Sequence, residues 1–189
     1  MDVAEFHSQG TADYFTYERG ADLIRDWTTN WLPGLVQTRA YAAALLRGLG
    51  HDKQTASAKV AHRMARQREV LARSEVRLIL DEAVLHREVG GPEVMRGQLT
   101  ALLDMPVSVS LRVVPFTVGA HRGMDGPFVL LDGPCGGVLY LENFAHDRTL
   151  VGGPLRAAYE GVWSALEAVA EPGGPVVDAA LERLTTRRP

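Results

Sequence analysis

Apolar residues recur at helical spacing near the start of the chain. Tyr17, Ala21, Ile24, Trp27 and Trp31 fall on one stripe when the chain turns with 3.6 residues per turn. This pattern predicts a first amphipathic helix, which ends at the Pro-Gly pair that follows Trp31.

Two more apolar stripes follow, and we expect a helix at each. The turn residues Gly50 and Ser74 punctuate them, and Thr38 stands where it would cap the first of the two. The stripes consist of Tyr41, Leu45 and Leu49, and of Val60, Met64, Gln67 and Leu71.

From Val76 the apolar period changes from the helical value to two. Residues 76–80 and 107–113 alternate between apolar and polar positions, which predicts two strands. A helix that opens at Pro92 lies between them, so the strands should be parallel with a right-handed crossover. Residues 128–132 and 138–142 flank a Gly-Pro-rich turn and predict a hairpin.

The C-terminal part returns to helical spacing. Pro154 opens one predicted helix, and a Pro/Gly break over 171–175 separates it from a short last helix over 176–185. We therefore expect a single α+β domain over 1–189, with a helical N-terminal half, then a small mixed β-sheet packed with helices, and a helical C-terminus.

Composition and charge exclude several classes of protein. A formal net charge of -3 argues against a dedicated nucleic-acid binder. Cys135 is the only cysteine, so no intramolecular disulfide can form. No signal peptide and no membrane-spanning apolar run is visible, so we expect a cytoplasmic protein that does not enter membranes. We expect no cofactor and no metal, because no cluster of metal-ligating residues with adequate spacing is present. The sequence does not decide whether the chain forms a homodimer.

The candidate ligand-binding residues surround the turn between the first two predicted helices. Trp27, Trp31, Gln37 and Tyr41 combine aromatic surface with a polar end, as small-molecule sites usually do, although the same residues also make an ordinary helix-turn-helix connection. Glu142, at the end of the last predicted strand, completes this group.

Three residues are candidates for proton transfer if the protein is an enzyme. Glu82 and His86 fall on one face if the chain is helical there, so the carboxylate can orient the imidazole, although capping and a simple ion pair explain the same spacing. His121 lies in a glycine-rich loop between strands.

A basic stretch covers the third predicted helix. It is most simply a solvated helix face, and docking to an acidic partner is the alternative. Its members are Lys59, His62, Arg63, Arg66, Arg68 and Arg73.

Several motifs together resemble a known family. The chain carries Pro-Gly-Leu-x-Gln-Thr-x-x-Tyr-Ala over 33–42, Arg-x-x-Arg-Gln over 63–67, Asp-Glu-Ala-x-Leu over 81–85, Gln-Leu-x-x-Leu over 98–102 and Gly-x-His-x-Gly-x-x-Gly-x-Phe over 119–128. In this it resembles the C-terminal, antitoxin-like domain of actinobacterial XRE-type helix-turn-helix regulators. The resemblance covers residues 14–170 and leaves 171–189 as a short helix and tail.

That resemblance implies a domain that senses a ligand or binds a small partner protein. Too few residues precede Tyr14 for a helix-turn-helix unit, so we expect no specific nucleic-acid binding by this chain alone. We expect a stand-alone regulator-type domain that binds a small molecule or a small partner protein in an apolar pocket. The alternative is a cofactor-free cyclase or isomerase of natural-product biosynthesis that uses the same pocket.

Overall fold

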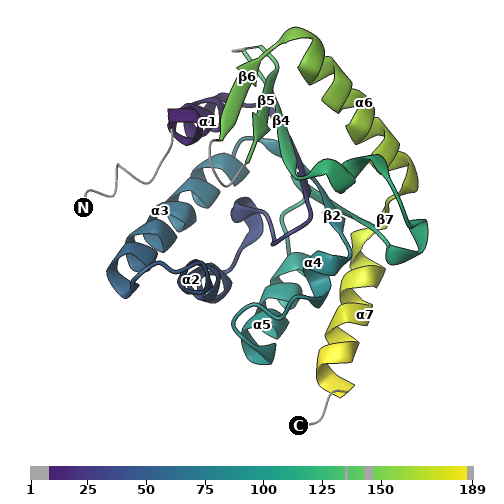
Figure 1. Ribbon diagram of the computed structural model, residues 1–189. Coiled ribbons are helices and arrows are strands. Elements are labelled where there is room, and N and C mark those ends of the chain that lie inside the picture. The colour runs from purple at the N-terminus through teal and green to yellow at the C-terminus, as the bar shows by residue number, and fades with distance from the viewer. Residues whose placement is uncertain (1–8, 135, 143–146, 187–189) are drawn as a thin grey trace.

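The computed structural model describes residues 9–134, 136–142 and 147–186. Within them a mixed β-sheet forms the centre of the molecule, and helices pack on both of its faces (Figure 1). This confirms the α+β prediction. The helices are α1 (Gln9–Gly20), α2 (Arg39–Gly48), α3 (Lys53–Leu71), α4 (Ala83–His86), α5 (Pro92–Leu103), α6 (Gly153–Val169) and α7 (Gly173–Thr186). The strands are β1 (Leu23–Thr28), β2 (Glu75–Asp81), β3 (Val109–Val114), β4 (Phe128–Asp132), β5 (Val138–Leu141), β6 (Arg148–Val151) and β7 (Glu171–Pro172).

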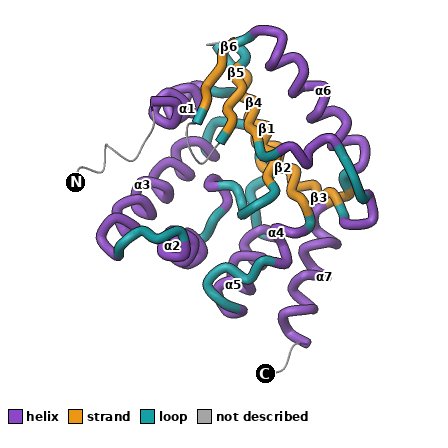
Figure 2. Tube along the Cα trace, viewed as in Figure 1, coloured by secondary structure: helices purple, strands orange, loops and turns teal. Residues whose placement is uncertain are grey.

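The strand order is β6-β5-β4-β1-β2-β3-β7, and the row of strands can be followed in Figure 2. Strands β1, β2 and β3 are parallel neighbours, whereas β4, β5, β6 and β7 each pair antiparallel with the strand beside them. The predicted parallel pair joined by a helix is therefore confirmed as β2-α5-β3, and the predicted hairpin as β4-β5.

The prediction of one helix through Ile24 and Trp27 is wrong. Helix α1 ends at Gly20, and the next residues form β1, which lies in the middle of the sheet between β2 and β4. A central strand is covered on both faces, so it carries apolar residues on both sides and loses the simple alternation of an exposed strand. Ile24 and Trp27 are three residues apart, a spacing that also fits a helix.

The two faces of the sheet bury different clusters. Trp27 and Leu130 pack with Trp163 of α6 on one face. Ile24 and Val76 belong to a cluster on the opposite face, where α1 and α3 lie. Helices α2, α4, α5 and α7 bury a further cluster beside it, against β2 and β3. Because neighbouring residues of a strand point to opposite faces, Asp26 points to the same face as Ile24, toward α3.

Candidate functional site

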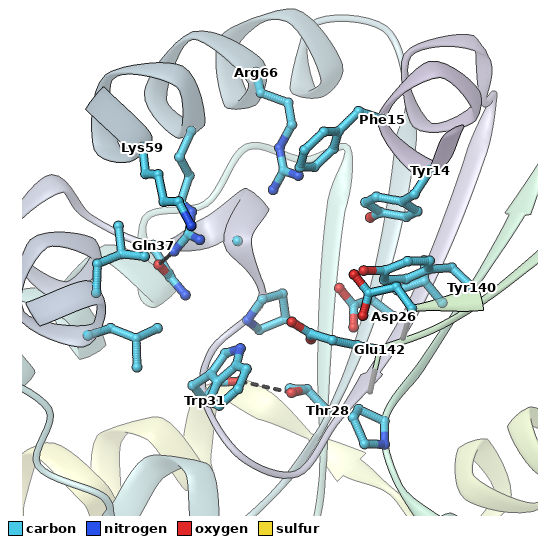
Figure 3. Close-up of a pocket in the computed structure, with 18 of the residues that line it drawn as sticks. Tyr14, Phe15, Asp26, Thr28, Trp31, Gln37, Lys59, Arg66, Tyr140 and Glu142 are labelled. Carbon is cyan, nitrogen blue, oxygen red and sulfur yellow. Dashed lines mark hydrogen bonds between the residues drawn. The ribbon is translucent and has the colours of Figure 1, made fainter. Parts of the chain in front are cut away.

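A cavity of about 610 Å³ lies between α3 and the sheet (Figure 3). Its walls come from α1, β1, the turn after Trp31, α2, α3 and the ends of β4 and β5. Its volume is within the range of small-molecule sites, which is about 300–1,000 Å³. Figure 3 shows aromatic side chains around it, with Trp31 at one end and Tyr14 and Tyr140 at the other.

One wall of the cavity is basic because of the helical spacing of α3. Lys59, Arg63 and Arg66 are spaced four and three residues apart, and His62 is spaced three residues from Lys59 and four from Arg66, so all four fall on the face that lines the cavity. Arg68, from the same basic stretch, is exposed and does not line it. The interpretation as a solvated helix face therefore does not hold for Arg63 and Arg66, which are both partly buried.

Arg63 has a neutral hydrogen-bond partner. Its Nη1 donates to Oε1 of Gln37, and it forms no ion pair with any residue in the described part of the chain. Desolvation by burial, followed by repulsion from Arg66, lowers the pKa of Arg63 to about 10. The guanidinium is thus a buried cation that lacks a counter-charge of its own.

Arg66 is held by a buried carboxylate. Its Nε lies 3.4 Å from Oε2 of Glu18, which is fully buried in α1, and its guanidinium carbon lies 4.7 Å from the ring centre of Phe15. The hydroxyl of Tyr14 donates to the other Glu18 oxygen at 2.5 Å. Burial and then Glu18 raise the pKa of Tyr14 well above its usual value, so the phenol keeps this proton. These contacts fix Arg66 beneath the cavity.

The opposite wall is acidic, and Asp26 lies at its centre. Burial, followed by the charges of Glu142 and Glu18, raises the pKa of Asp26 to about 8, although Arg66 acts to lower it. Within the described residues the Asp26 carboxyl makes no hydrogen bond and no ion pair. At neutral pH it is therefore largely protonated, although it faces a cavity that solvent and ligands can enter.

Glu142 follows β5 and projects into the same region as Asp26 (Figure 3). The surrounding protein desolvates its carboxyl and Asp147 repels it, so its pKa is raised, while Arg63 and Arg66 lower it. Its side chain as a whole remains exposed because it stands at the open side of the cavity.

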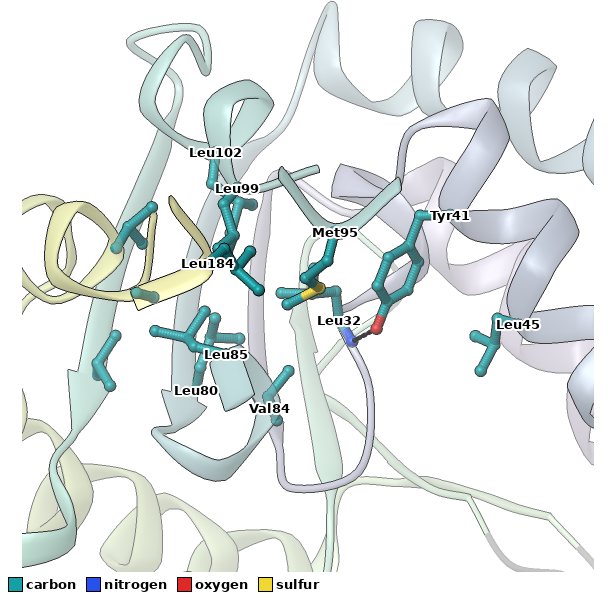
Figure 4. Close-up of a cluster of buried hydrophobic side chains, with 13 residues drawn as sticks. Leu32, Tyr41, Leu45, Leu80, Val84, Leu85, Met95, Leu99, Leu102 and Leu184 are labelled. Carbon is teal, nitrogen blue, oxygen red and sulfur yellow. Dashed lines mark hydrogen bonds between the residues drawn. The ribbon is translucent and has the colours of Figure 1, made fainter. Parts of the chain in front are cut away.

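Three of the five residues expected to bind a ligand present their side chains at this cavity, namely Trp31, Gln37 and Glu142. Trp27 adjoins the cavity, but its indole is fully buried in the core on the other face of the sheet. Tyr41 does not line the cavity. Its ring is fully buried in the core cluster, beside Leu32 and beside Met95 of α5, and its hydroxyl accepts a hydrogen bond from the Leu32 N–H at 3.3 Å (Figure 4). The phenol thus satisfies a buried backbone donor rather than facing open space.

The residues expected to transfer protons lie elsewhere, beyond the carboxyl end of β2. Glu82 accepts a hydrogen bond from the Phe116 N–H at 2.8 Å and lies 3.0 Å from Nε2 of His86, which confirms that the two share one face. These contacts and the charge of Arg183 lower the pKa of Glu82 despite its desolvation. Neither Glu82 nor His86 lines the cavity.

His121 packs on the opposite side of the sheet from the cavity. Its ring meets the Trp27 ring edge-on at 5.4 Å, and its Nε2 lies 3.5 Å from Oδ2 of Asp81. The Trp27 indole belongs to the core beneath α6 and donates to the Gly123 carbonyl at 3.0 Å. The structure therefore does not bring His121 or Glu82 into one cavity with Trp31 and Gln37.

Sequence reasoning missed Asp26, the residue that distinguishes this site. Had residues 23–28 been read as a strand, Asp26 would have stood between Ile24 and Thr28 on a buried face, and a carboxylate there is uncommon. The role of Arg63 and Arg66 also depends on which face of α3 meets the sheet, which the sequence does not reveal.

Neither a metal centre nor a membrane segment is found in the described part of the chain. No group of three or more histidine, cysteine or carboxylate side chains is arranged to hold a metal ion in those residues. None of the described helices is long and apolar enough to cross a membrane.

Comparison with known proteins gives one match. Residues 11–178 match the model of a domain of unknown function, DUF5753. No curated protein matches the chain.

Proposed function

We propose that this chain, which belongs to the DUF5753 family, is a regulator-type domain that binds a small molecule in the cavity beneath α3. The observation that carries the proposal is a ligand-sized cavity at which titratable side chains converge, two of them without a direct ion pair among the described residues. Asp26 and Arg63 both line it, and neither forms an ion pair within the described residues. Desolvated titratable groups with perturbed pKa values in a cavity are typical of functional sites.

Three of the motifs that resemble XRE-type regulators contact one another at or beside this cavity, which supports the regulator-type assignment. Gln67 donates to the carbonyls of Gly34 and Gln37 at 2.7 and 2.8 Å. Gln98 donates to the Val36 carbonyl at 2.8 Å. The motifs over 33–42 and 63–67 thus form one wall, from which Arg63 and Arg66 project, and Gln98 holds the turn of that wall in place from outside the cavity.

A small partner protein is the other occupant that the resemblance implies. Protein interfaces of standard size bury about 800 Å² on each partner and are seldom built around a single deep cavity. The ligand-sized volume and aromatic lining of this site favour a small molecule.

A cofactor-free isomerase or cyclase is a second candidate, and one observation favours it. The pKa of Asp26 is about 8, close to physiological pH, and general acids and bases work best when their pKa lies near the working pH. In such an enzyme Asp26, rather than Glu82, His86 or His121, would face the substrate. Chemical conversion of a bound ligand, detected by mass spectrometry, would distinguish this candidate from a binding domain.

The binding function can be tested with a fragment library and two matched tryptophan variants. Ala58 and Ala61 are both exposed on α3, but only Ala58 lines the cavity. We expect saturation-transfer NMR to detect fragments bound to the wild-type protein and to Ala61→Trp, and to lose them with Ala58→Trp. Fragments that bind equally to both variants, or a library without hits, would contradict the proposal.

A further inference from the structure

The charges of the cavity are separated into two sides. Arg63 and Arg66 reach it from α3, while Asp26 and Glu142 reach it from the sheet. In Figure 3 the Arg66 guanidinium and the two carboxyls occupy different parts of the cavity, with Asp26 and Glu142 close to each other. A ligand that fills the space therefore meets positive charge at one end and carboxyl groups at the other.

The basic end is suited to an anion. Among the residues that the structure describes, Arg63 has only the Gln37 amide as a side-chain partner, and the proximity of Arg66 disfavours its charge. The Nε of Arg66 makes no hydrogen bond with a described residue, although Glu18 lies 3.4 Å away. Two adjacent guanidiniums can bind a carboxylate or phosphate by donating charge-assisted hydrogen bonds to it, and the negative charge of this anion would relieve the repulsion between them.

The acidic end is suited to a cation that donates hydrogen bonds. Asp26 and Glu142 repel each other electrostatically, and Asp26 has no ion-pair partner within the described chain. A primary ammonium carries three donors and a positive charge, so it can contact both carboxyls at once. An ammonium bound beside Asp26 would lower the pKa of its carboxyl, which would then lose its proton.

We infer that the ligand is a compact zwitterion, with a carboxylate or phosphate at Arg63 and Arg66, an ammonium at Asp26 and Glu142, and an apolar body between the aromatic walls. The inference rests on the proposed ligand-binding function and adds the chemical class of the ligand. Neither half of such a molecule satisfies both ends of the cavity, so both charges are needed for full affinity.

Binding of this ligand should depend on pH through Asp26. Ammonium binding favours the ionised carboxyl, so affinity rises as pH approaches the Asp26 pKa of about 8, and a proton is released on binding at pH 7. The charged and titratable groups around Asp26 are Tyr14 and Glu18 on α1, Arg63 and Arg66 on α3, and Glu142 and Asp147 beside the sheet. The pKa of Glu142 is raised, like that of Asp26.

Four matched probes test the charge requirement by NMR titration of the wild-type chain. Para-aminomethylbenzoate carries both charges, para-methylbenzylamine and para-methylbenzoate carry one each, and para-methylbenzyl alcohol carries none. We expect para-aminomethylbenzoate to bind at least about tenfold more tightly than either singly charged probe, as one charge-assisted contact allows. Calorimetry in buffers of different ionisation enthalpy should also detect the released proton.

Matched variants assign each end of the ligand. Arg63→Met should weaken para-aminomethylbenzoate and para-methylbenzoate while sparing para-methylbenzylamine, and Arg68→Met, an exposed arginine on the same helix, should change none of them. Asp26→Asn should weaken the two amines and abolish proton release, with exposed Asp178→Asn as its control. Melting curves show whether each variant is folded. If a variant does not fold, the comparison of the four probes on the wild-type protein still tests the inference.

Two outcomes would overturn this inference while the ligand-binding function survives. One is that the four probes bind with equal affinity. The other is that none of the four probes binds, although library fragments bind to the wild-type protein and lose their binding in the Ala58→Trp variant. The proposed function fails in a different way, namely when no fragment binding depends on Ala58 at all.

Discussion

The Asp26→Asn variant should be more stable than the wild-type protein at neutral and alkaline pH. In the folded chain the Asp26 pKa is about 8, against 3.8 for an unperturbed aspartate. Between those values the folded state holds a proton that the unfolded state has lost, so stability falls as pH rises. Asparagine resembles the protonated carboxyl and never ionises, so the variant escapes this loss.

The size of the effect follows from that pKa difference. Each pH unit inside the window lowers the free energy of unfolding by at most about 1.4 kcal/mol, or about 6 kcal/mol over the whole window. Asp26 is only partly buried because it faces the cavity, and water there reduces the penalty. We therefore expect the variant to gain about 1–3 kcal/mol near pH 8.5, and less as pH falls toward 5.

Urea unfolding of wild-type, Asp26→Asn and Asp178→Asn proteins at several pH values measures this difference. Asp178 is exposed on α7 and controls for the general effect of removing a carboxylate. Groups that do not interact with Asp26 contribute equally to wild type and variant and cancel in the difference, whereas Glu142 and Glu18, which interact with it, add to the measured effect. If Asp26→Asn and the wild type have the same dependence of stability on pH, Asp26 is not a buried, protonated carboxyl and the reasoning is wrong.

Three further substitutions test the assignments of individual residues. Tyr41→Phe leaves the buried Leu32 N–H without its acceptor, so urea unfolding should show a loss of about 1–3 kcal/mol while ligand affinity is unchanged. In Gly34→Ala the new Cβ would lie 2.5 Å from Nη2 of Arg66, and the flexible guanidinium can move aside. We therefore expect the free energy of unfolding to change by less than about 1 kcal/mol. Because Arg66 is displaced, NMR titration should show a several-fold loss of affinity for para-aminomethylbenzoate. Glu82→Gln should bind that probe like the wild type, because Glu82 is not among the lining residues; loss of binding would instead support the sequence-based hypothesis that Glu82 belongs to the site.

The sequence determined the features that depend on near neighbours along the chain. Thr38 was expected to cap α2, and its side chain does accept a hydrogen bond from the Tyr41 N–H. Pro92 opens α5 as predicted, and Glu82 and His86 form the expected pair. Caps, proline starts and pairs four residues apart are local interactions, so residue type and spacing are enough to predict them.

The aromatic part of the candidate site was also visible in the sequence. Trp31 and Gln37 lie in a turn motif whose residue types suggested a ligand pocket, and both line the cavity. Tyr41 shows the limit of that reasoning. A tyrosine on a helix near a turn can point its hydroxyl into a pocket or toward a buried backbone donor, and only the burial of its ring in the core cluster beside Leu32 and α5 decided for the latter.

The tertiary structure alone decided where the charges meet. Residues 23–28 form a strand because β2 and β4, which are distant in sequence, hydrogen-bond to both of its edges, and that pairing outweighs the helical spacing of Ile24 and Trp27. The same pairing turns Asp26 toward α3 and places it opposite Arg63, 37 positions later in the sequence. Local periodicity carries no information about such long-range contacts, so the sequence by itself specified most of the elements but not the site that they enclose.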